Sequence, residues 1–323
     1  MNAVANGAVK LNNAGAKSIF GDYLIMLLAP CFMAYWYYGV RSLFVIAASV
    51  AAAVITDALA GIIINKKIDI GDLSSVFTGA AIALMMPASV PYYVPVFASL
   101  FAVAVVKAPF GGSMKAPFVP AAAGFAFASV CFEEQVFGFN AGTQEKIFGS
   151  ASLGSMLMKG RAVYVGPASI FDIIGGNVAG PMGTGCAILM VACAVYLLIK
   201  RPKALISSVS FIAACVMMIS LFPRVTASFK TNLVPELCSG SLLFAAVFLI
   251  TEPATQPQKI LNKIIYGAVC GVICMGMRHM GAYEETVCFA ILLTNALRPI
   301  FDSAINNMPK PRKKASRKEV QAK

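Results

Sequence analysis

The sequence predicts an all-α polytopic membrane protein, and composition and hydropathy are the first grounds for that prediction. Hydrophobic residues make up 59% of the 323 residues and charged residues only 12%, whereas a soluble domain carries about 25% charged residues. The mean hydropathy is +0.78. The chain therefore has about half the charge that a water-facing surface needs, and a soluble fold is excluded.

Apolar runs in the sequence mark ten predicted transmembrane helices. In chain order they cover about 19–38, 42–64, 74–87, 88–106, 119–137, 184–199, 204–222, 238–251, 263–282 and 286–303. A helix needs about 20 apolar residues to cross the hydrocarbon core of a bilayer. The runs 74–87 and 238–251 are therefore too short to span it comfortably.

The two short runs resemble each other. From Phe77 the chain reads FTGAAIALMMPASVP, and from Cys238 it reads CSGSLLFAAVFLITEPATQP. Both open on small residues and close on a Pro-Ala-x-x-Pro step. Short segments bounded by Gly and Pro at matching places in two halves are typical of broken helices around a central site. Five spans per half is an odd number, so the second half is predicted to be inverted relative to the first.

Lysine and arginine are distributed unequally between the predicted loops. With the C-terminal tail inside, the inner loops and termini hold 19 of the 26 basic residues. The outer loops hold the other seven: Arg41, Lys146, Lys159, Arg161, Arg224, Lys230 and Arg278. Basic residues accumulate in cytoplasmic loops, so both termini are predicted to be cytoplasmic.

These boundaries divide the chain into five predicted parts. They are a cytoplasmic segment (1–18), a first five-helix repeat (19–137), an extracytoplasmic loop (138–183), a second repeat (184–303) and a basic cytoplasmic tail (304–323). The first segment is polar and lacks the apolar core of a signal peptide, so no cleavage is expected.

Net charge and cysteine content bound the function further. The net charge is +12, and seven of the basic residues lie in the tail KPRKKASRKEVQAK. A basic run beside a membrane span anchors topology or contacts lipid. The lipid bilayer is therefore an expected partner, and nucleic acid is not.

The nine cysteines lie mostly in apolar runs without a CxxC motif. They are interpreted as small buried hydrophobes, with a metal or iron–sulfur site shared with another subunit as the alternative.

Asp57 and Lys107 are charged candidates in or beside the predicted spans of the first half. Asp57 lies two-thirds of the way through its span, in AAAVITDALAG, and a carboxylate at that depth is a candidate for an ion path. The alternative is a surface contact with Lys66 or Lys67. Lys107 closes the fourth span.

The residues that follow Lys107 suggest a ligand. Gly111 and Gly112 allow close backbone approach and can present N–H groups to an anion. Lys107, Gly111 and Gly112 are therefore candidates for cofactor binding, and an ordinary interfacial lysine is the alternative.

The second half carries fewer polar candidates. Glu252 follows the second short helix and is the other candidate for the ion path, with Thr255 close behind it as a cofactor candidate. The pair also fits a helix cap or turn. His279, beside Arg278, is predicted to be interfacial rather than catalytic. The small residues that open the two broken helices complete the cofactor candidates: Thr78, Gly79, Ser239 and Gly240.

Four segments of the chain resemble one known family. They are IGDLSSVFTGAAIALMMPASVPYYVPVFASLFAVAVVKAPFGG, FVPAAAGFAF, SGSLLFAAVFLITEPATQPQ and GAYEETVCFAILLTNALRPIFD. The last three are similar to F-N-P-A-x-x-G, S-G…T-D-P-x-T-S-P and F-A-I-L-L-x-N-A-L-x-P-x-I-D of the membrane subunit RnfD of the Rnf complex and NqrB of the sodium-pumping quinone reductase. The resemblance covers nearly the whole chain, and the length favours RnfD over the longer NqrB.

The resemblance implies a fold, a function and partners. The fold would be ten spans in two inverted repeats, similar to urea-transporter architecture. The chain would be the D subunit of a prokaryotic inner-membrane complex that couples electron transfer between ferredoxin and NAD to sodium or proton movement. Its partners would be the other membrane and peripheral subunits. The family also implies FMN bonded to a threonine in an S-G-A-T motif, and riboflavin or another second flavin.

The sequence departs from the family at the flavin motif. The matching region reads IFGSASLGSMLMKGRAVYVG, which aligns Ser152 with the acceptor threonine. Ser150 replaces the motif's glycine, and Leu153-Gly154 replaces its Pro-Leu step. Covalent FMN on Ser152 is one interpretation, and a flavin-poor subunit with solvated hydroxyls at Ser150 and Ser152 is the other. Thr143 and Thr184 are weaker acceptors.

Two further departures lie elsewhere. Thr184 occupies a position where the family has glutamate, and Val119 occupies the asparagine position of F-N-P-A.

Three functions remain open on the sequence. The first is the D subunit of an Rnf-type oxidoreductase complex, the second a flavin-free channel or permease on the same fold, and the third a scaffold paralogue. Nothing in the chain resembles a nicotinamide or ferredoxin site, so no activity is expected of the isolated chain.

Overall fold

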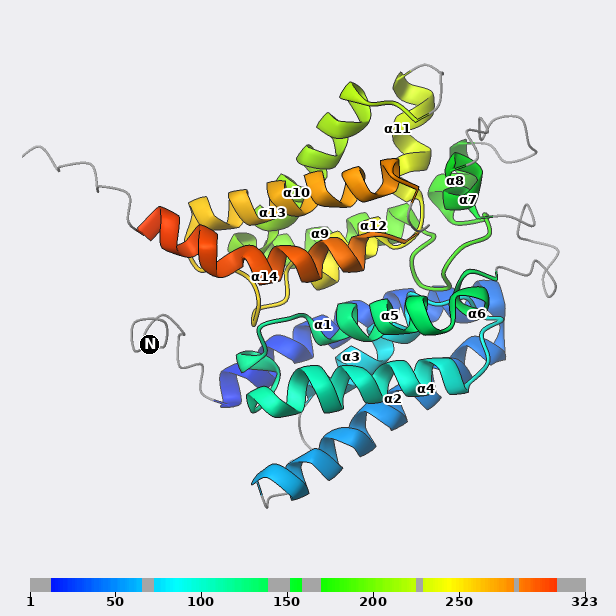
Figure 1. Ribbon diagram of the computed structural model, residues 1–323. Helices are drawn as coiled ribbons and strands as arrows, with labels where there is room; N and C mark the ends of the chain where they lie inside the picture. The colour runs from blue at the N-terminus through cyan, green and yellow to red at the C-terminus, as the bar shows by residue number, and fades with distance from the viewer. Residues whose placement is uncertain are drawn as a thin grey trace, which may run out of the picture.

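The computed structural model describes residues 13–65, 73–138, 152–158, 170–224, 229–281 and 285–306. Figure 1 shows these parts as helices joined by short turns. In the first half they are α1 (Asn13–Tyr38), α2 (Val40–Ala60), η2 (Gly61–Asn65), α3 (Leu73–Leu84), α4 (Tyr93–Phe101), η3 (Ala102–Lys107), η4 (Ala108–Phe110), η5 (Ser113–Lys115), α5 (Pro120–Cys131) and α6 (Glu133–Phe137). In the rest they are α7 (Leu153–Met158), α8 (Ile170–Gly175), α9 (Ala187–Lys200), α10 (Pro202–Leu221), α11 (Phe229–Cys238), α12 (Leu242–Phe244), η7 (Ala245–Leu249), α13 (Ile260–His279) and α14 (Val287–Asn306).

Several of these helices have the length and composition to cross a membrane. Five qualify by both measures: Ser18–Tyr38, Val40–Ile63, Tyr93–Phe110, Pro202–Leu221 and Ile260–His279. Three shorter apolar helices accompany them: Leu73–Leu84, Pro120–Cys131 and Ala187–Lys200. Large apolar side chains such as Leu28 and Ile63 face outward, as expected for a surface covered by lipid. The predicted all-α polytopic membrane fold is confirmed.

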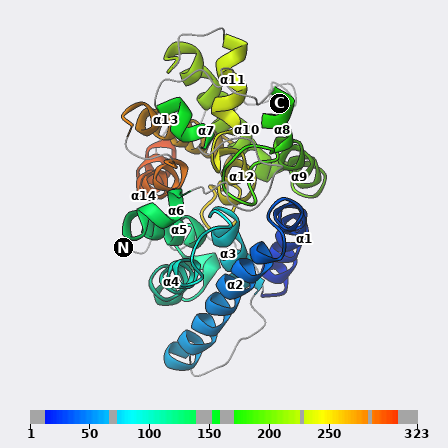
Figure 2. The same cartoon turned by 90° about the vertical axis from the view of Figure 1, so that its right-hand side faces the viewer.

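The helices form two groups that follow the predicted order. Figures 1 and 2 show α1 to α6, in blue to green, in one half and α9 to α14, in green to red, in the other. The start of α1 and the end of α14 lie at the same end of the molecule in Figure 1. The ten predicted spans require this placement.

Contacts between α1 and α9 show that these two helices run in opposite directions. Asp22 in the first half of α1 pairs with Arg201 just after α9, at 3.1 Å. Further along α1, the backbone oxygen of Met26 accepts from the Cys193 thiol at 3.7 Å. As residue numbers rise along α1 they fall along α9. The first helices of the two groups are therefore antiparallel, as inversion of one half requires.

Both broken helices are held by a serine from the helix that precedes them in the repeat. The Ser49 hydroxyl of α2 donates to the Gly79 oxygen of α3 at 2.6 Å. In the second group the Ser208 hydroxyl of α10 donates to the Ala246 oxygen of η7. A serine hydroxyl therefore binds the broken helix at matching places in the two groups. The similarity between the two short runs of sequence thus extends to their packing.

The broken helices are shorter than the apolar runs that predicted them. The run 74–87 forms a helix only over Leu73–Leu84, and 238–251 only over Leu242–Leu249. The residue before a proline disfavours the α conformation, so Pro87 and Pro253 end the helical stretch early. The second helix also starts late, because Gly240 takes a left-handed φ of 62°.

Three further differences concern connections. The predicted span 119–137 is divided at Phe132, whose ψ of 45° separates α5 from α6. The predicted loop 138–183 contains α7 and α8 in its described parts, and α11 forms before the second broken helix. Short helices in these connections were not predicted, because their sequences lack a sustained apolar period.

Helices α10 and α13 pack closely through two glycines. A Cβ at Gly267 would lie 2.2 Å from the Ser207 oxygen, and one at Gly271 would lie 2.8 Å from the Phe211 oxygen. Glycines four residues apart let two membrane helices approach closely and gain dispersion contacts. This contact fixes the frame around the second broken helix.

Candidate functional site

Asp57 and Lys107 form an ion pair inside the first group of helices. The Asp57 Oδ2 atom lies 3.0 Å from the Lys107 Nζ atom, with the lysine side chain 1% exposed and the aspartate 19%. The same Nζ donates to the Ser75 hydroxyl at 2.5 Å. Asp57 comes from α2, Ser75 from α3 and Lys107 from the end of η3. The structure therefore joins two of the predicted candidates.

The ammonium group of Lys107 pairs with the Asp57 carboxylate. An anion site formed by Lys107 and the two glycines that follow it stays a prediction. Gly111 is exposed and has a φ of 79°. It lies in a turn in which the Gly112 N–H donates to the Lys107 oxygen at 3.3 Å. The alternative partners of Asp57, Lys66 and Lys67, lie outside the described residues.

Glu252 approaches this pair from the second half. It follows η7, is 2% exposed and interacts electrostatically with Lys107. Among the described residues, its Oε2 atom has no hydrogen-bond partner. Buried carboxylates are nearly always paired. The second broken helix thus brings an acid toward a cation held by the first half.

Thr255 lies three residues further along the same turn. Its hydroxyl is buried and lacks a hydrogen-bond partner within the described part of the chain. Its backbone oxygen accepts from Arg298 of α14 at 2.7 Å. Nearby, Tyr266 of α13 donates to the Asn295 side-chain oxygen of α14 at 2.6 Å. Glu252 and Thr255 therefore lie in a buried polar region between the turn, α13 and α14.

The opening residues of the first broken helix serve packing. The Thr78 hydroxyl donates to the Ser74 oxygen one turn earlier, at 2.8 Å. A Cβ at Gly79 would lie 2.8 Å from the Ser49 oxygen, so glycine lets α3 approach α2. Neither residue lines a described cavity.

The start of the second broken helix is occupied by a carboxylate. Glu285 accepts from the Ser241 N–H at 2.5 Å and from the Ser241 hydroxyl at 2.7 Å. An anion is favoured at a helix start, and here the chain supplies its own. Ser239 instead accepts from buried Arg278, at 2.9 Å. Ser239 thus binds a side chain of the protein itself, and Gly240 lies against Glu285. Their role in cofactor binding stays a prediction.

Burial and neighbouring groups change the pKa of Glu285 in opposite directions. Burial raises the pKa of its carboxyl above the ordinary value, while Arg278 and the hydrogen bonds from Ser241 oppose that rise. The connection between α13 and α14 thus places an acid that depends on its neighbours to remain charged.

Arg278 was predicted to lie in an outer loop, but its side chain is buried. It is 2% exposed and also donates to the Glu236 oxygen at 2.9 Å. The Glu236 carboxylate in turn pairs with Arg224. The adjacent His279 packs edge-on against Phe222. The buried charge of Arg278 thus joins the end of α13 to α11.

Substituting Gly240 by alanine should disrupt this helix start. A Cβ there would lie 1.8 Å from the Glu285 Oε1 atom, so the carboxylate has to leave the Ser241 N–H. We expect a loss of about 3 kcal/mol or more in unfolding free energy, from backbone strain together with an unsatisfied buried group. Denaturant titration of the purified chain measures it.

Gly281→Ala is the matched control for that change. Gly281 has a similar φ of 67° but nothing within 4 Å of its Cβ position. It should lose only about 1 kcal/mol, from strain alone. Equal losses in the two variants would show that Glu285 does not hold the helix start.

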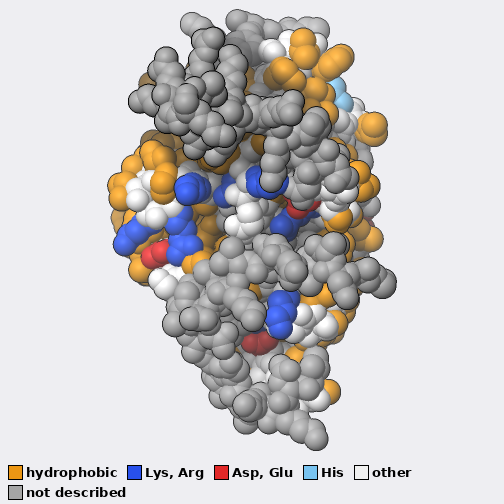
Figure 3. All heavy atoms as spheres, turned by 90° about the vertical axis from the view of Figure 1, so that its left-hand side faces the viewer, with side chains coloured by type: hydrophobic (Ala, Val, Ile, Leu, Met, Phe, Trp, Pro, Cys, Tyr) orange, Lys and Arg blue, Asp and Glu red, His pale blue; other side chains and the backbone are white. Residues whose placement is uncertain are grey.

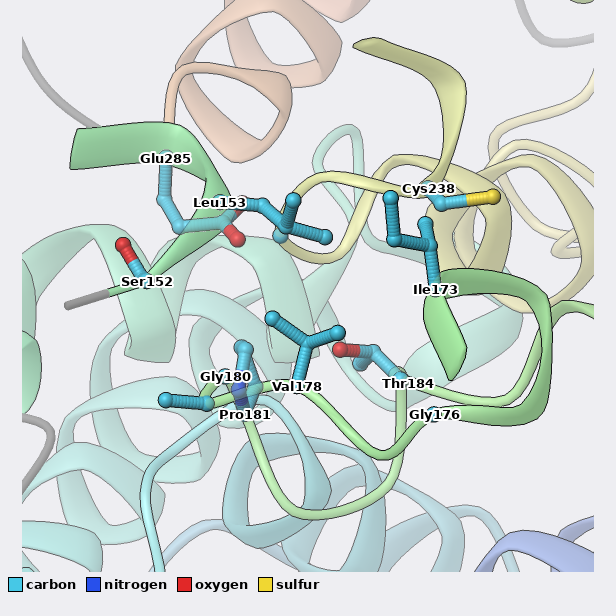
Figure 4. A pocket seen from close by; sticks show the side chains of 13 residues that line it. Ser152, Leu153, Ile173, Gly176, Val178, Gly180, Pro181, Thr184, Cys238 and Glu285 are labelled. Carbon is cyan, nitrogen blue, oxygen red and sulfur yellow. The ribbon is translucent and has the colours of Figure 1, made fainter. Parts of the chain in front are cut away.

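Ser152 lines a small cavity between α7, the turn before α9 and the second broken helix. The cavity measures about 20 Å³, room for a single water. In Figure 4, Ser152 and Glu285 lie on one side of the cavity and Thr184 lies on the other side. Leu153 and Val178 lie between the two sides. Ser152 is buried, at 4% exposure, which differs from the predicted solvated hydroxyl. Ser150 and Thr143 lie outside the described residues.

The nine cysteines are free thiols, and five of them are buried. Within the described ranges, no group of three or more His, Cys, Asp or Glu side chains is arranged to hold a metal ion. The interpretation of most cysteines as small buried hydrophobes agrees with this arrangement.

The fold and the site together define a class, namely an all-helical polytopic membrane protein with a buried ion pair beside its first broken helix. The chain belongs to the NQR2, RnfD, RnfE family, whose model matches residues 8–310. The family resemblance drawn from the motifs is therefore confirmed.

Curated relatives cover most of the chain. The chain is 28% identical to the D subunit of the proton-translocating ferredoxin:NAD(+) oxidoreductase complex of Clostridium ljungdahlii, over 82% of each chain. It is 27% identical to the D subunit of the Na(+)-translocating ferredoxin:NAD(+) oxidoreductase complex of Acetobacterium woodii, over 88% of this chain and 87% of the relative. It is 25% identical to the D subunit of an ion-translocating oxidoreductase complex of Methanosarcina acetivorans, over 91% of each.

Several residues of the site were not predicted from the sequence. Ser75 contacts the candidate Lys107, and Glu285 contacts Ser241 at the start of the second broken helix, only after folding, because these partners lie 32 and 44 residues away. Glu236 lies in a helix that was not predicted. The small residues SGS that open the second broken helix were the one usable signal, because a helix start attracts an anion.

Proposed function

We propose that this chain is the membrane-embedded D subunit of an Rnf-type complex that couples electron transfer between ferredoxin and NAD to sodium or proton movement. Family membership over residues 8–310 supports this proposal. Among the complexes named for its relatives, one translocates protons and another Na⁺. The proposal includes the other subunits of the complex as partners, a prokaryotic inner membrane and cytoplasmic termini. The comparisons do not favour the channel or scaffold alternatives.

The structural observation behind the proposed ion path is the buried pair of Asp57 and Lys107, together with the buried Glu252, which interacts electrostatically with Lys107. When all three groups are ionised, two carboxylates and one ammonium leave a net charge of −1. A site of that charge, within a low-dielectric region, suits one monovalent cation or one proton. The chain's own groups would hold that charge between the two halves while electrons pass through the complex.

Glu252→Gln in the whole complex tests this function. We expect ion accumulation in vesicles to fall about tenfold or more, because the neutral amide removes the net negative charge. Electron transfer from ferredoxin to NAD should continue when the ion gradient is collapsed. Glu134→Gln, at an exposed position of α6, is the matched control and should accumulate ions as the wild type does. Unchanged accumulation in Glu252→Gln would remove Glu252 from the path.

Covalent FMN on Ser152 stays a prediction of the resemblance, and the described residues around Ser152 do not fit it. Sites for ligands of this size measure about 300–1,000 Å³, against about 20 Å³ beside this buried hydroxyl. When bound, a flavin would supply electron transfer. Riboflavin or another second flavin also stays a prediction.

On this geometry we expect the denatured wild-type chain to carry no flavin fluorescence after expression with an active flavin transferase. Ser152→Ala should look the same, and a relative with the threonine motif should fluoresce in parallel. Fluorescence in the wild type that is lost in Ser152→Ala would show that Ser152 is the acceptor and that the cavity opens.

A further inference from the structure

A basic cavity lies at the end of the molecule where α1 begins and α9 ends. It measures about 380 Å³ and is lined by Tyr23, Lys200, Arg201, Pro202, Lys203, Ala204, Thr251, Pro253 and Gln256. Figure 3 looks at this end and shows Lys and Arg side chains gathered across the middle of the face. Its lining does not include Asp57 or Lys107, but the lining residues Thr251 and Pro253 flank Glu252 of the proposed ion path. The proposed function assigns no ligand to the cavity itself.

The charges around the cavity favour an anion. Lys200, Arg201 and Lys203 all line it, and Asp22 is the acid paired with Arg201, at 3.1 Å. Glu252, between the lining residues Thr251 and Pro253, acts electrostatically on Tyr23 and is a second acid. Three positive groups against two acids leave a net charge of +1 when all are ionised. The Arg201 Nε atom is buried and has no hydrogen-bond partner in the described part of the chain. The rim can therefore donate a hydrogen bond to a ligand and attract a negative charge.

The helix that begins at the cavity adds to this preference. α10 starts at Pro202 and runs for 20 residues, so the positive end of its dipole lies at the rim. Backbone N–H groups of a helix start commonly bind phosphate. Two lysines, an arginine and a helix start together match the oxygens of a phosphate group.

The floor of the cavity is fixed by hydrogen bonds. Tyr23 donates to the Thr251 oxygen at 2.7 Å. Gln256 donates to the Ala204 oxygen at 2.6 Å and accepts from Lys263 at 2.9 Å. These bonds tie α1, the turn after η7 and the start of α10 into one frame. A site held in this way loses little freedom when a ligand binds.

Apolar surface beside the cavity indicates where the ligand comes from. Ile199 and Leu198, next to Lys200, are 76% and 50% exposed, and Leu28 on α1 is 67% exposed. Such side chains on a membrane helix face acyl chains. A phosphate in the cavity is therefore within reach of a lipid whose tails lie along α9 and α1.

We propose that this cavity binds the phosphodiester headgroup of an anionic phospholipid. Basic pockets between membrane helices on the cytoplasmic side take such headgroups. Lys200 and Lys203 recognise the charge, Arg201 and the start of α10 hold the phosphate oxygens, and the exposed faces of α9 and α1 carry the acyl chains. The lipid joins the two halves of the molecule at this end.

Lipid binding to the purified full-length chain tests the proposal. Native mass spectrometry would count phosphatidylglycerol and phosphatidylcholine molecules retained by the wild type and by Lys200→Gln/Lys203→Gln. We expect the wild type to prefer phosphatidylglycerol, and the double variant to lose about 10- to 30-fold in affinity for it. Both lysines are exposed, so the variant should fold, and its denaturant midpoint checks this.

Lys115→Gln is the matched control, because Lys115 is also an exposed lysine and does not line the cavity. It should retain phosphatidylglycerol as the wild type does. Equal retention of the lipid by the double variant, or equal binding of phosphatidylcholine by the wild type, would overturn the proposal. So would inorganic phosphate that binds as tightly as the lipid, since the source would then be a free anion.

Discussion

Asp57→Asn should be among the most destabilising substitutions in the chain. It leaves Lys107, whose side chain is 1% exposed, without its carboxylate partner. Breaking a buried ion pair from one side costs about 3–5 kcal/mol. Lys107→Met should cost less, because Asp57 is 19% exposed and reaches water more easily. The denaturant midpoint of the purified chain measures both changes.

The double variant Asp57→Asn/Lys107→Met measures the interaction between the two side chains apart from their contacts with other residues. With neither charge present, most of the loss should be regained, which corresponds to a coupling of about 2–3 kcal/mol in a double-mutant cycle. Additive losses would mean that the two side chains do not depend on each other. Transport in the same variants then separates a role in stability from a role in the ion path.

Gly267→Ala is the second substitution with a large expected effect. The new Cβ would lie 2.2 Å from the Ser207 oxygen and 3.0 Å from the Phe211 N atom. Both neighbours are backbone, so α10 and α13 have to separate. We expect a loss of about 2–3 kcal/mol in unfolding free energy, as for other overpacked interiors. The denaturant midpoint reports it.

Gly276→Ala, on the same helix, is the control for Gly267→Ala. Nothing lies within 4 Å of its Cβ position. Alanine has the higher helix propensity, so this variant should be neutral or gain up to about 1 kcal/mol. Opposite signs for two glycines nine residues apart would show that close packing, not propensity, determines the effect. A similar small gain at Gly267 would contradict the described contact.

Local patterns predicted most of the fold. Apolar runs located α1, α2, α10 and α13, because burial in lipid depends on composition over about 20 residues. The echo around Pro87 and Pro253 located the broken helices, since proline acts on the residues next to it. Helix ends were less accurate, because they depend on single residues such as Gly240.

The site was predicted only in part, because its pairings are tertiary. Asp57 and Glu252 stood out as charges in apolar surroundings. The sequence favoured no carboxylate as partner for Lys107, since Asp57 lies on another helix and charge alone does not select among acids. Glu285 stayed hidden for the same reason. Its role depends on a helix start that begins more than 40 residues earlier.

The bond from Tyr23 to the Thr251 oxygen bears on how the chain is made. Its two ends are 228 residues apart in sequence, and those of the Arg201–Asp22 bond are 179 apart. A ribosome inserts the first half long before these partners exist. Until residues 201 and 251 are made, Asp22 and Tyr23 lack these partners. Biogenesis of this protein should depend on protection of α1 until synthesis is nearly complete.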